Sequence, residues 1–425
     1  MRRDDQSELP LLHLALILSL AGSSVALLLR VCSAGPVEGQ RISASGEIRT
    51  SRSRGTGHRA KLCGVYFNPQ VRPGGPRFPW LRHYDKCRHA VNKELAELVG
   101  KTGINFICIQ LLIADTLKDG APVSHWGSKI TDWADLAALD NLVAFLAHCR
   151  TLGVCVEIDL ANNMWIPYAV DCAHHTANHR WWPKPSATPW VESIVWYTQV
   201  IQYVEGKASD PGTIALWDMF GNYQLGGAEP VLWNTPDCPE IARWTEAFVK
   251  RVWPAFRKAG SRPKGAPIVL PILSKSDYWR QKSAAERLSA VSNLKRWLVD
   301  DLKMPPDYWV MTSYVRSDPA TDGFCYLKAI VDILGRQNAG RIVSTDFKGP
   351  GHDLSGAIVD TRGMTGAEML QWHFAKVDEY GLGGWWIWSY RDTATSQTGI
   401  RDAQGRWKED LVNVIRQRTG LLGRH

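Results

Sequence analysis

The sequence predicts an α/β fold, a (β/α)8 barrel, over residues 61–425. Two observations predict this fold. Short apolar or β-branched runs alternate with longer amphipathic segments, and eight such runs follow one another along the chain. Strands that are buried on both faces read as continuous apolar runs, and alternating strands and helices form a parallel sheet. An open, doubly wound sheet is less favoured, because no Gly-x-Gly-x-x-Gly pattern follows the first run.

The elements follow in chain order, and a barrel of about 365 residues lies within the usual size of this fold. The strands are predicted at residues 62–67, 104–110, 154–160, 213–220, 267–273, 308–314, 341–347 and 383–390. The helices are predicted at residues 91–102, 133–152, 190–205, 241–258, 284–302, 324–337, 366–380 and 409–418.

Residues 11–29 run without a formal charge between Arg3 and Arg30. This length lies between that of an export signal and that of a spanning helix. Residues 1–34 are therefore predicted to be either a cleaved signal peptide or an uncleaved signal anchor. Residues 35–60 are rich in Gly, Ser, Thr and Arg and are predicted to be a flexible tether. We expect the barrel outside the cytoplasm, either secreted or periplasmic, or held at a membrane only through residues 11–29.

The composition excludes some classes of partner. The net charge of +8 comes from 50 Lys and Arg against 42 Asp and Glu, and residues 1–61 supply half of that excess. Residues 62–425 contain no basic run, so no nucleic-acid partner is expected. The three histidines within residues 174–179 share no helical pattern, and no Cys-x-x-Cys pair occurs. Neither a metal nor a cofactor is therefore expected.

The nine cysteines fall into different environments. Cys63, Cys108 and Cys155 lie inside apolar runs, where buried free thiols are the ordinary outcome. Cys172 and Cys238 lie in long loops of a chain that is predicted to be exported. These two are the candidates for a disulfide.

Tryptophan is unusually frequent, with 20 Trp against 12 Tyr and 10 Phe. Active sites in this fold lie on the loops that follow the carboxyl ends of the strands. Ten tryptophans fall on those loops, where a flat indole can stack on the apolar face of a pyranose ring, and together they favour a glycan cleft. They are Trp80, Trp126, Trp133, Trp165, Trp181, Trp182, Trp190, Trp233, Trp279 and Trp388.

Two strand ends carry the most specific motifs. Residues 217–223 read WDMFGNY, and residues 343–348 read VSTDFK. Across residues 62–416 the order of such motifs resembles the superfamily of retaining β-glycosidase barrels, especially cellulases and β-mannanases. In those proteins the first motif reads W-D-L-F-N-E-P and its Glu is the general acid/base, whereas this chain has Asn222 there. The second motif carries the nucleophilic Glu, and this chain has Asp346, one methylene shorter.

Other positions extend the resemblance. Tyr314 matches a tyrosine that hydrogen-bonds the nucleophile, Trp388 matches a tryptophan under the sugar, and residues 399–408 are similar to the pattern that follows it. Cys108 and Ala161 depart from the family, which has Arg and His there. The resemblance implies that stacking residues are kept while ionisable residues are changed. The expected contacts to substrate are Asp159, Asn162, Trp126, Trp165, Tyr223, Trp233, Trp279 and Trp388.

The mechanism that the resemblance implies needs two carboxyl groups about 5–5.5 Å apart. Asn222 has no proton to give at neutral pH, and the loss of general acid catalysis costs about 10²–10⁴-fold in rate. Asp346 places its carboxylate roughly 1 Å further back than a Glu would. We therefore expect a protein that binds a β-linked oligo- or polysaccharide with weak or no standard hydrolysis, that is, a pseudoenzyme.

Two alternatives stay open. The first is an active glycoside hydrolase or transglycosidase, in which Asp346 is the nucleophile and a non-standard group is the acid. Asp218 and Glu229 are candidates for that acid, although a structural role for Asp218 and a solvated loop position for Glu229 are favoured over catalysis. The second is a membrane-tethered accessory protein of polysaccharide assembly or export, which residues 11–29 and the tether suggest.

Overall fold

We describe the protein from a computed structural model. The chain divides into two units, Met1–Arg41 and Ile42–His425, and every described residue belongs to the second. The structure describes residues 61–69, 80–111, 116–118, 129–159, 188–218, 284–301, 303, 305–306, 308–312, 323–347, 349–350, 360–392 and 399–421.

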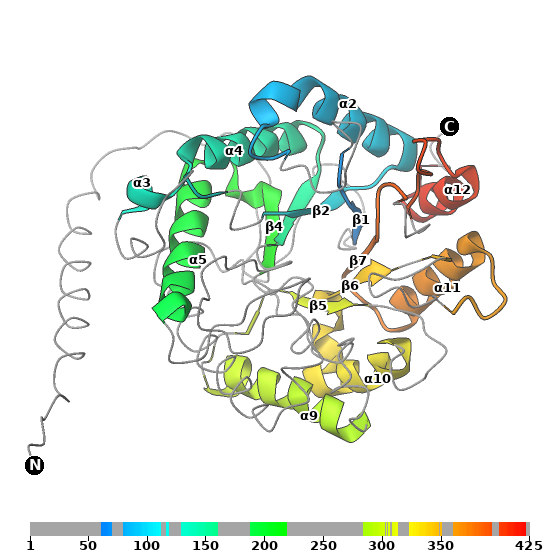
Figure 1. Ribbon diagram of the computed structural model, residues 1–425. Helices are drawn as coiled ribbons and strands as arrows, with labels where there is room; N and C mark the ends of the chain where they lie inside the picture. Colours follow the sequence, from blue (N-terminus) through cyan, green and yellow to red (C-terminus); the bar gives the residue numbers. More distant parts are fainter. Residues whose placement is uncertain are drawn as a thin grey trace, which may run out of the picture. The chain divides into compact units, whose positions relative to one another are not determined.

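Seven parallel strands form one sheet in the order β4-β3-β2-β1-β7-β6-β5 (Figure 1). The first and last strands pair with each other, as Leu62 lies beside Gly384 and Cys63 beside Trp385. Seven of the eight predicted strands are therefore confirmed, and the remaining one, at residues 267–273, lies outside the described residues. The strands are β1 (Leu62–Tyr66), β2 (Phe106–Gln110), β3 (Cys155–Asp159), β4 (Ile214–Asp218), β5 (Trp309–Thr312), β6 (Ile342–Phe347) and β7 (Gly384–Ile387).

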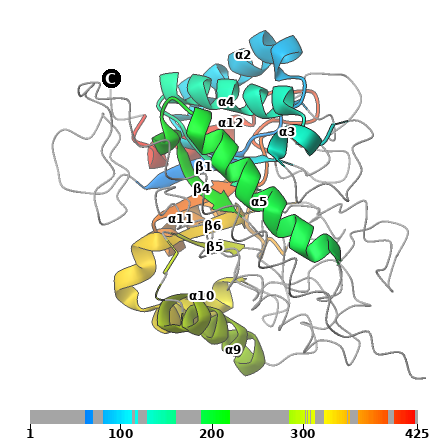
Figure 2. The same cartoon turned by 90° about the vertical axis from the view of Figure 1, so that its left-hand side faces the viewer.

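Helices follow the strands in the predicted order, and the predicted helix at residues 241–258 lies outside the described residues. Neighbouring helices contact each other, including α2 with α4, α4 with α5, and α11 with α12. Figures 1 and 2 both show α5 beside β4. The helices are α2 (Tyr84–Thr102), α3 (Ile130–Trp133), α4 (Leu136–Thr151), α5 (Thr188–Lys207), α9 (Ala284–Lys295), α10 (Gly323–Leu334), α11 (Gly366–Glu379) and α12 (Glu409–Arg418).

The sheet separates two hydrophobic clusters, because successive side chains of a strand point to opposite faces. Along β7, Trp385 and Ile387 belong to the outer cluster that packs against the helices, whereas Trp386 belongs to the inner cluster. Gly64 of β1 allows close packing on the inner side, since a Cβ atom there would lie 2.5 Å from the carbonyl oxygen of Phe106. The inner side is thus filled with side chains, as in other barrels of this class.

The cysteines of the apolar runs agree with the prediction. Cys63, Cys108 and Cys155 are buried thiols that form no disulfide, and burial raises the pKa of the Cys63 thiol to about 12. Cys172 and Cys238 lie outside the described residues. Among the helices that the structure describes, none is long and apolar enough to cross a bilayer, and residues 11–29 are not among them.

Candidate functional site

The carboxyl ends of the strands bring several predicted and unpredicted residues to the inner side of the barrel. Alternation along β3 places Cys155, Glu157 and Asp159 on one face, and Cys155 belongs to the inner cluster. Asp159 is the last residue of β3 and is only 3% exposed. By register its Cα lies beside those of Gln110 and Asp218. Polar positions of three neighbouring strands therefore meet at one level, at the strand ends.

An aromatic stack lies on the inner side of the barrel at the ends of β1 and β7, and we define it as Tyr66, Trp386 and Trp388. The rings of Tyr66 and Trp388 lie nearly parallel, with centroids 4.2 Å apart and an angle of 18° between their planes. The rings of Tyr66 and Trp386 are tilted by 37°, with centroids 6.3 Å apart. All three side chains belong to the inner cluster, and the peptide bond from Trp388 to Ser389 is cis.

A hydrogen bond across the barrel ties this stack to β3. The indole Nε1 of Trp386 donates to Oε2 of Glu157 at 2.8 Å, and both residues are buried. Glu157 is fully buried, one inward position deeper than Asp159. A buried carboxylate without access to solvent suits a bracing role better than contact with a ligand.

The backbone of β6 shifts its register at the position of the expected nucleophile. Ser344 lies beside Trp385 and Phe347 lies beside Ile387, so two residues of β6, Thr345 and Asp346, stand opposite one residue of β7. Such an extra residue bends a strand locally. Asp346 thus lies in the irregular carboxyl-terminal part of β6, next to the strand that carries the aromatic stack.

Outward residues on both sides of Asp346 are anchored to α11. Oγ of Ser344 and Nε2 of His373 lie 2.8 Å apart in a buried hydrogen bond. The rings of Phe347 and His373 stack at 4.2 Å. Burial lowers the pKa of His373 to about 3, so its imidazole is neutral at ordinary pH. These two contacts hold the backbone that flanks Asp346.

Among the predicted site residues, the structure describes Trp388, Asp159 and the backbone of Asp346, each at the carboxyl-terminal end of its strand. The others lie outside the described residues, and their predicted roles stay predictions. They are Asn222, Tyr314, Asn162, Trp165, Tyr223, Trp233, Trp279 and Trp126.

Two of the ten loop tryptophans, Trp80 and Trp133, lie in the outer cluster between the sheet and the helices, which corrects the prediction for them. Trp388 is also buried, at 8% exposed, but belongs to the inner cluster. Trp133 is 0% exposed and its indole Nε1 donates to Oε1 of Gln199 at 3.0 Å. Trp80 is buried and packs edge-on against Phe67 and Phe145. Both rings complete the layer between the helices and the sheet, and neither is a platform for a ligand.

Sequence reasoning missed Tyr66 as a site residue. The apolar run that contains it predicts a strand but does not indicate which aromatic ring lies against which. The alternation along residues 62–66 together with that along residues 384–388 could have indicated the pair, because both inward series end on an aromatic ring at the same level of neighbouring strands.

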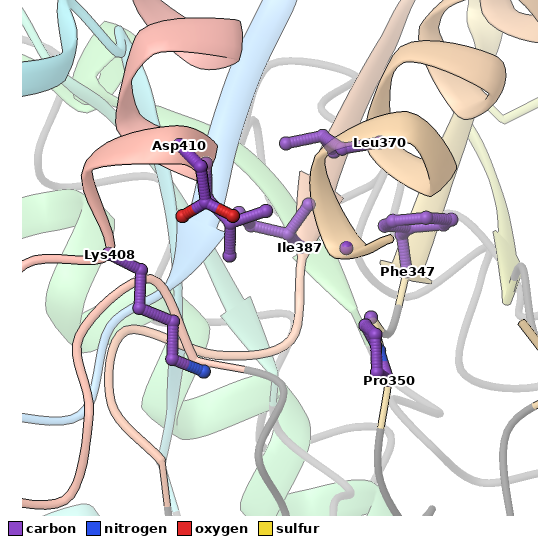
Figure 3. A pocket seen from close by; sticks show the side chains of 9 residues that line it. Phe347, Pro350, Leu370, Ile387, Lys408 and Asp410 are labelled. Atoms are coloured by element: carbon purple, nitrogen blue, oxygen red, sulfur yellow. The ribbon is translucent and has the colours of Figure 1, made fainter. Parts of the chain in front are cut away.

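A separate pocket of about 190 Å³ lies on the outer side of the sheet, between the first turns of α11 and α12 (Figure 3). Phe347, Leu370 and Ile387 give it an apolar wall, and Lys408 and Asp410 line it from the start of α12 and the residue before it. Nζ of Lys408 is paired with Asp392 at 2.8 Å. Among the residues that the structure describes, no cluster of His, Cys, Asp and Glu could hold a metal ion.

Comparisons with known proteins identify the fold. No protein-family model and no curated protein matches the chain. An exo-beta-1,4-mannosidase from Opitutaceae bacterium strain TAV5 has a similar structure, with a TM-score of 0.55 and 15% identity over 90% of this chain and 63% of that one. This chain therefore spans less than two thirds of the mannosidase.

Two further solved structures are similar over more of their length. A GH5_18 protein from Streptomyces cattleya in complex with GlcNAc has a TM-score of 0.53 and 13% identity over 84% of this chain and 80% of that one. A GH5_18 variant from Bifidobacterium longum in complex with Manb1-4GlcNAc has a TM-score of 0.52 and 13% identity over 86% and 79%. These structures confirm the predicted (β/α)8 barrel fold.

Proposed function

We propose that the protein is a carbohydrate-active barrel that binds a β-linked glycan at the carboxyl ends of its strands. One observation carries the proposal: the stacked rings of Tyr66 and Trp388 lie on the inner side of the barrel, and the backbone of Trp388 is hydrogen-bonded to Phe347, the neighbour of Asp346. A flat aromatic surface beside a carboxylate suits a pyranose, which has an apolar face and hydroxyl groups at its rim. The solved structures with this fold include a mannosidase and two complexes with sugars, which supports the same class of ligand.

Turnover by the standard mechanism is weak or absent in this proposal. Asn222 replaces the general acid, whose loss costs about 10²–10⁴-fold in rate. Asp346 and Asp159 then serve as acceptors for sugar hydroxyl groups, and Trp388 supplies the stacking surface. Trp126, Trp165, Trp233, Trp279, Asn162 and Tyr223 are the proposed further contacts from the loops.

A glycan-array screen of the full chain, run beside a reducing-sugar assay, tests this function. We expect binding of β-linked oligosaccharides without steady release of reducing ends. Trp388→Ala should abolish binding, whereas Trp80→Phe, which changes a buried tryptophan of the outer layer, should leave it within about twofold. Lack of binding to any β-glycan by the folded wild-type protein would disprove the proposal.

A second candidate function is hydrolysis or transglycosylation with Asp346 as nucleophile and a non-standard acid. The register shift of β6 favours it, because the extra residue moves the backbone of Asp346 and can offset its shorter side chain. Steady sugar release that Asp346→Ala abolishes and Asp346→Glu retains would establish this activity. Equal release by the wild type and by Asp346→Ala would remove it.

We also propose that the barrel works outside the cytoplasm, with residues 1–34 as a signal peptide or anchor. In the anchored form it would act as an accessory protein of polysaccharide assembly or export. Cell fractionation combined with N-terminal sequencing of the mature protein separates these cases. A mature chain that starts near residue 35 indicates secretion, an intact membrane-bound chain indicates an anchor, and an intact cytoplasmic chain would contradict both.

A further inference from the structure

We propose that Tyr66 is a positioning residue that fixes the plane of the Trp388 indole, so that a single face of that indole meets a sugar ring. This inference rests on the proposed function and adds a residue to it. Tyr66 lies at the end of β1, the strand that pairs with β7. Its ring is parallel to that of Trp388 within 18° at a centroid distance of 4.2 Å.

The Tyr66 ring packs on one face of the Trp388 indole and also contacts Trp386. Alternation along β7 places Trp386 one inward position deeper than Trp388. The Tyr66 ring contacts both indoles, stacked on Trp388 and tilted against Trp386. Because Tyr66 covers one face of the Trp388 indole, a ligand that stacks on Trp388 in the proposed function meets the other face.

The backbones that carry the two rings are fixed relative to each other. The carbonyl oxygen of Tyr66 accepts a hydrogen bond from the backbone N–H of Tyr390 at 2.9 Å, two residues beyond Trp388. The backbone N–H of Trp388 in turn donates to the carbonyl oxygen of Phe347 at 2.8 Å. One set of bonds thus links the end of β1, the stacking residue and the strand that carries Asp346.

The lower end of the stack is fixed as well. The indole N–H of Trp386 donates to the buried carboxylate of Glu157 at 2.8 Å, so the ring on which Tyr66 leans is tied to β3. Without the Tyr66 ring, the Trp388 side chain would lose the ring that packs on one of its faces and would gain freedom to turn. A ligand that stacks on Trp388 would then have to order it at the cost of affinity.

The experiment compares full-length wild type, Tyr66→Phe and Tyr66→Leu, with Phe374→Leu as the matched control. Phe374 packs at 4.4 Å against Trp385 on the outer face of the same strand, so its loss removes a similar aromatic contact away from the site. The probes are cellohexaose and mannohexaose, titrated by tryptophan fluorescence. A second readout is the ¹⁹F resonance of Trp388 in protein labelled with 5-fluorotryptophan, which Trp388→Phe assigns.

We expect Tyr66→Leu to weaken binding about three- to tenfold, which corresponds to the loss of one aromatic pair, and to shift or broaden the Trp388 resonance. Tyr66→Phe, which keeps the ring, should retain the resonance and bind within about twofold of the wild type. Phe374→Leu should change neither. If Tyr66→Leu does not fold, Tyr66→Met takes its place in both measurements.

An unchanged Trp388 resonance in Tyr66→Leu overturns the role of Tyr66, and so does an equal loss of affinity in Phe374→Leu. A folded wild type that binds neither these probes nor any other β-glycan disproves the proposed function instead. In that case the resonance still decides whether Tyr66 orients Trp388. The two failures are therefore distinguishable.

Discussion

His373 makes the stability of the folded protein depend on pH. It is fully buried, hydrogen-bonded to Ser344 and stacked on Phe347. Its pKa falls from 6.5 to about 3 because burial penalises the charged form. The unfolded chain therefore binds a proton at a pH where the folded chain does not. The stability that this residue confers is complete above pH 6.5 and is lost as the pH falls toward 3.

We predict that His373→Gln removes this dependence. Between pH 7 and pH 5, protonation of the unfolded histidine should cost the wild type about 2 kcal/mol of unfolding free energy that the variant does not lose. Urea denaturation at the two pH values measures the difference. A variant whose unfolding free energy falls between the two pH values as much as that of the wild type would show that His373 is not buried in its neutral form.

For single residues, the sequence predicts burial and the face of a strand more readily than it predicts which residues contact each other. The burial of Cys63 and Cys155 follows from their apolar runs, and Asp159 follows from the alternation of β3. The burial of Trp133 could not be predicted, because the position of a tryptophan after a strand is the same whether its side chain faces a cleft or packs against a helix. The acceptor for its indole, Gln199, lies 66 positions away in the chain.

At the scale of elements, α5 is attached to the sheet by an indole hydrogen bond. Trp217 of β4 is 1% exposed and its Nε1 donates to Oε1 of Glu205 at 2.9 Å. A hydrogen bond to a charged acceptor contributes more than a neutral one, about 1.5–3 kcal/mol. This bond therefore sets the position of α5 along the edge of the described sheet.

We predict that Trp217→Phe lowers the unfolding free energy by about 2–4 kcal/mol, because it removes the donor and part of a packed ring. A double-mutant cycle with Glu205→Ala isolates the bond, with an expected coupling of about 1–2 kcal/mol. Chemical denaturation of the four proteins gives the values. Strict additivity of the two substitutions would mean that the bond contributes nothing.

Some helix boundaries could be predicted from the sequence, whereas others could not. The predicted helix at residues 133–152 is α4, which begins later, at Leu136, because Ala134 is extended and the side chain of Asp135 caps α4 by accepting from the N–H of Ala138. Trp133 is instead the last residue of the separate short helix α3. An Asp before an apolar helical run is a known cap, so this boundary was available from the sequence. The start of α2 at Tyr84 was not, since its first turns are mostly polar and exposed.

At the scale of the whole barrel, the end of α12 is hydrogen-bonded to the end of α2. The Oγ1 of Thr419, just after α12, donates to the carbonyl oxygen of Thr102 at the end of α2. Nearby, Arg391 pairs with Glu94 at 3.1 Å, and both side chains are mostly buried. The first contact joins the end of α12 to α2, and the second joins the segment after β7 to α2.

We predict that Ile415→Ala, which empties a site that is 1% exposed on α12, lowers the unfolding free energy by about 2–4 kcal/mol. Asn413→Ala on the exposed side of the same helix should stay within about 0.5 kcal/mol of the wild type. Thermal and urea unfolding followed by circular dichroism compare them. Equal stability of the two variants would show that α12 does not pack on the barrel core.

The pairing of β1 with β7 also constrains the order of events during synthesis. Leu62 emerges early, yet its neighbour Gly384 appears only after most of the chain has been made. Contacts between such distant segments form late and slow the folding of a domain. Until β7 arrives, one edge of β1 carries unpaired backbone groups, which are prone to pair with other chains. The nascent barrel therefore depends on rapid completion, or on a chaperone that shields this edge, more than a fold with local contacts would.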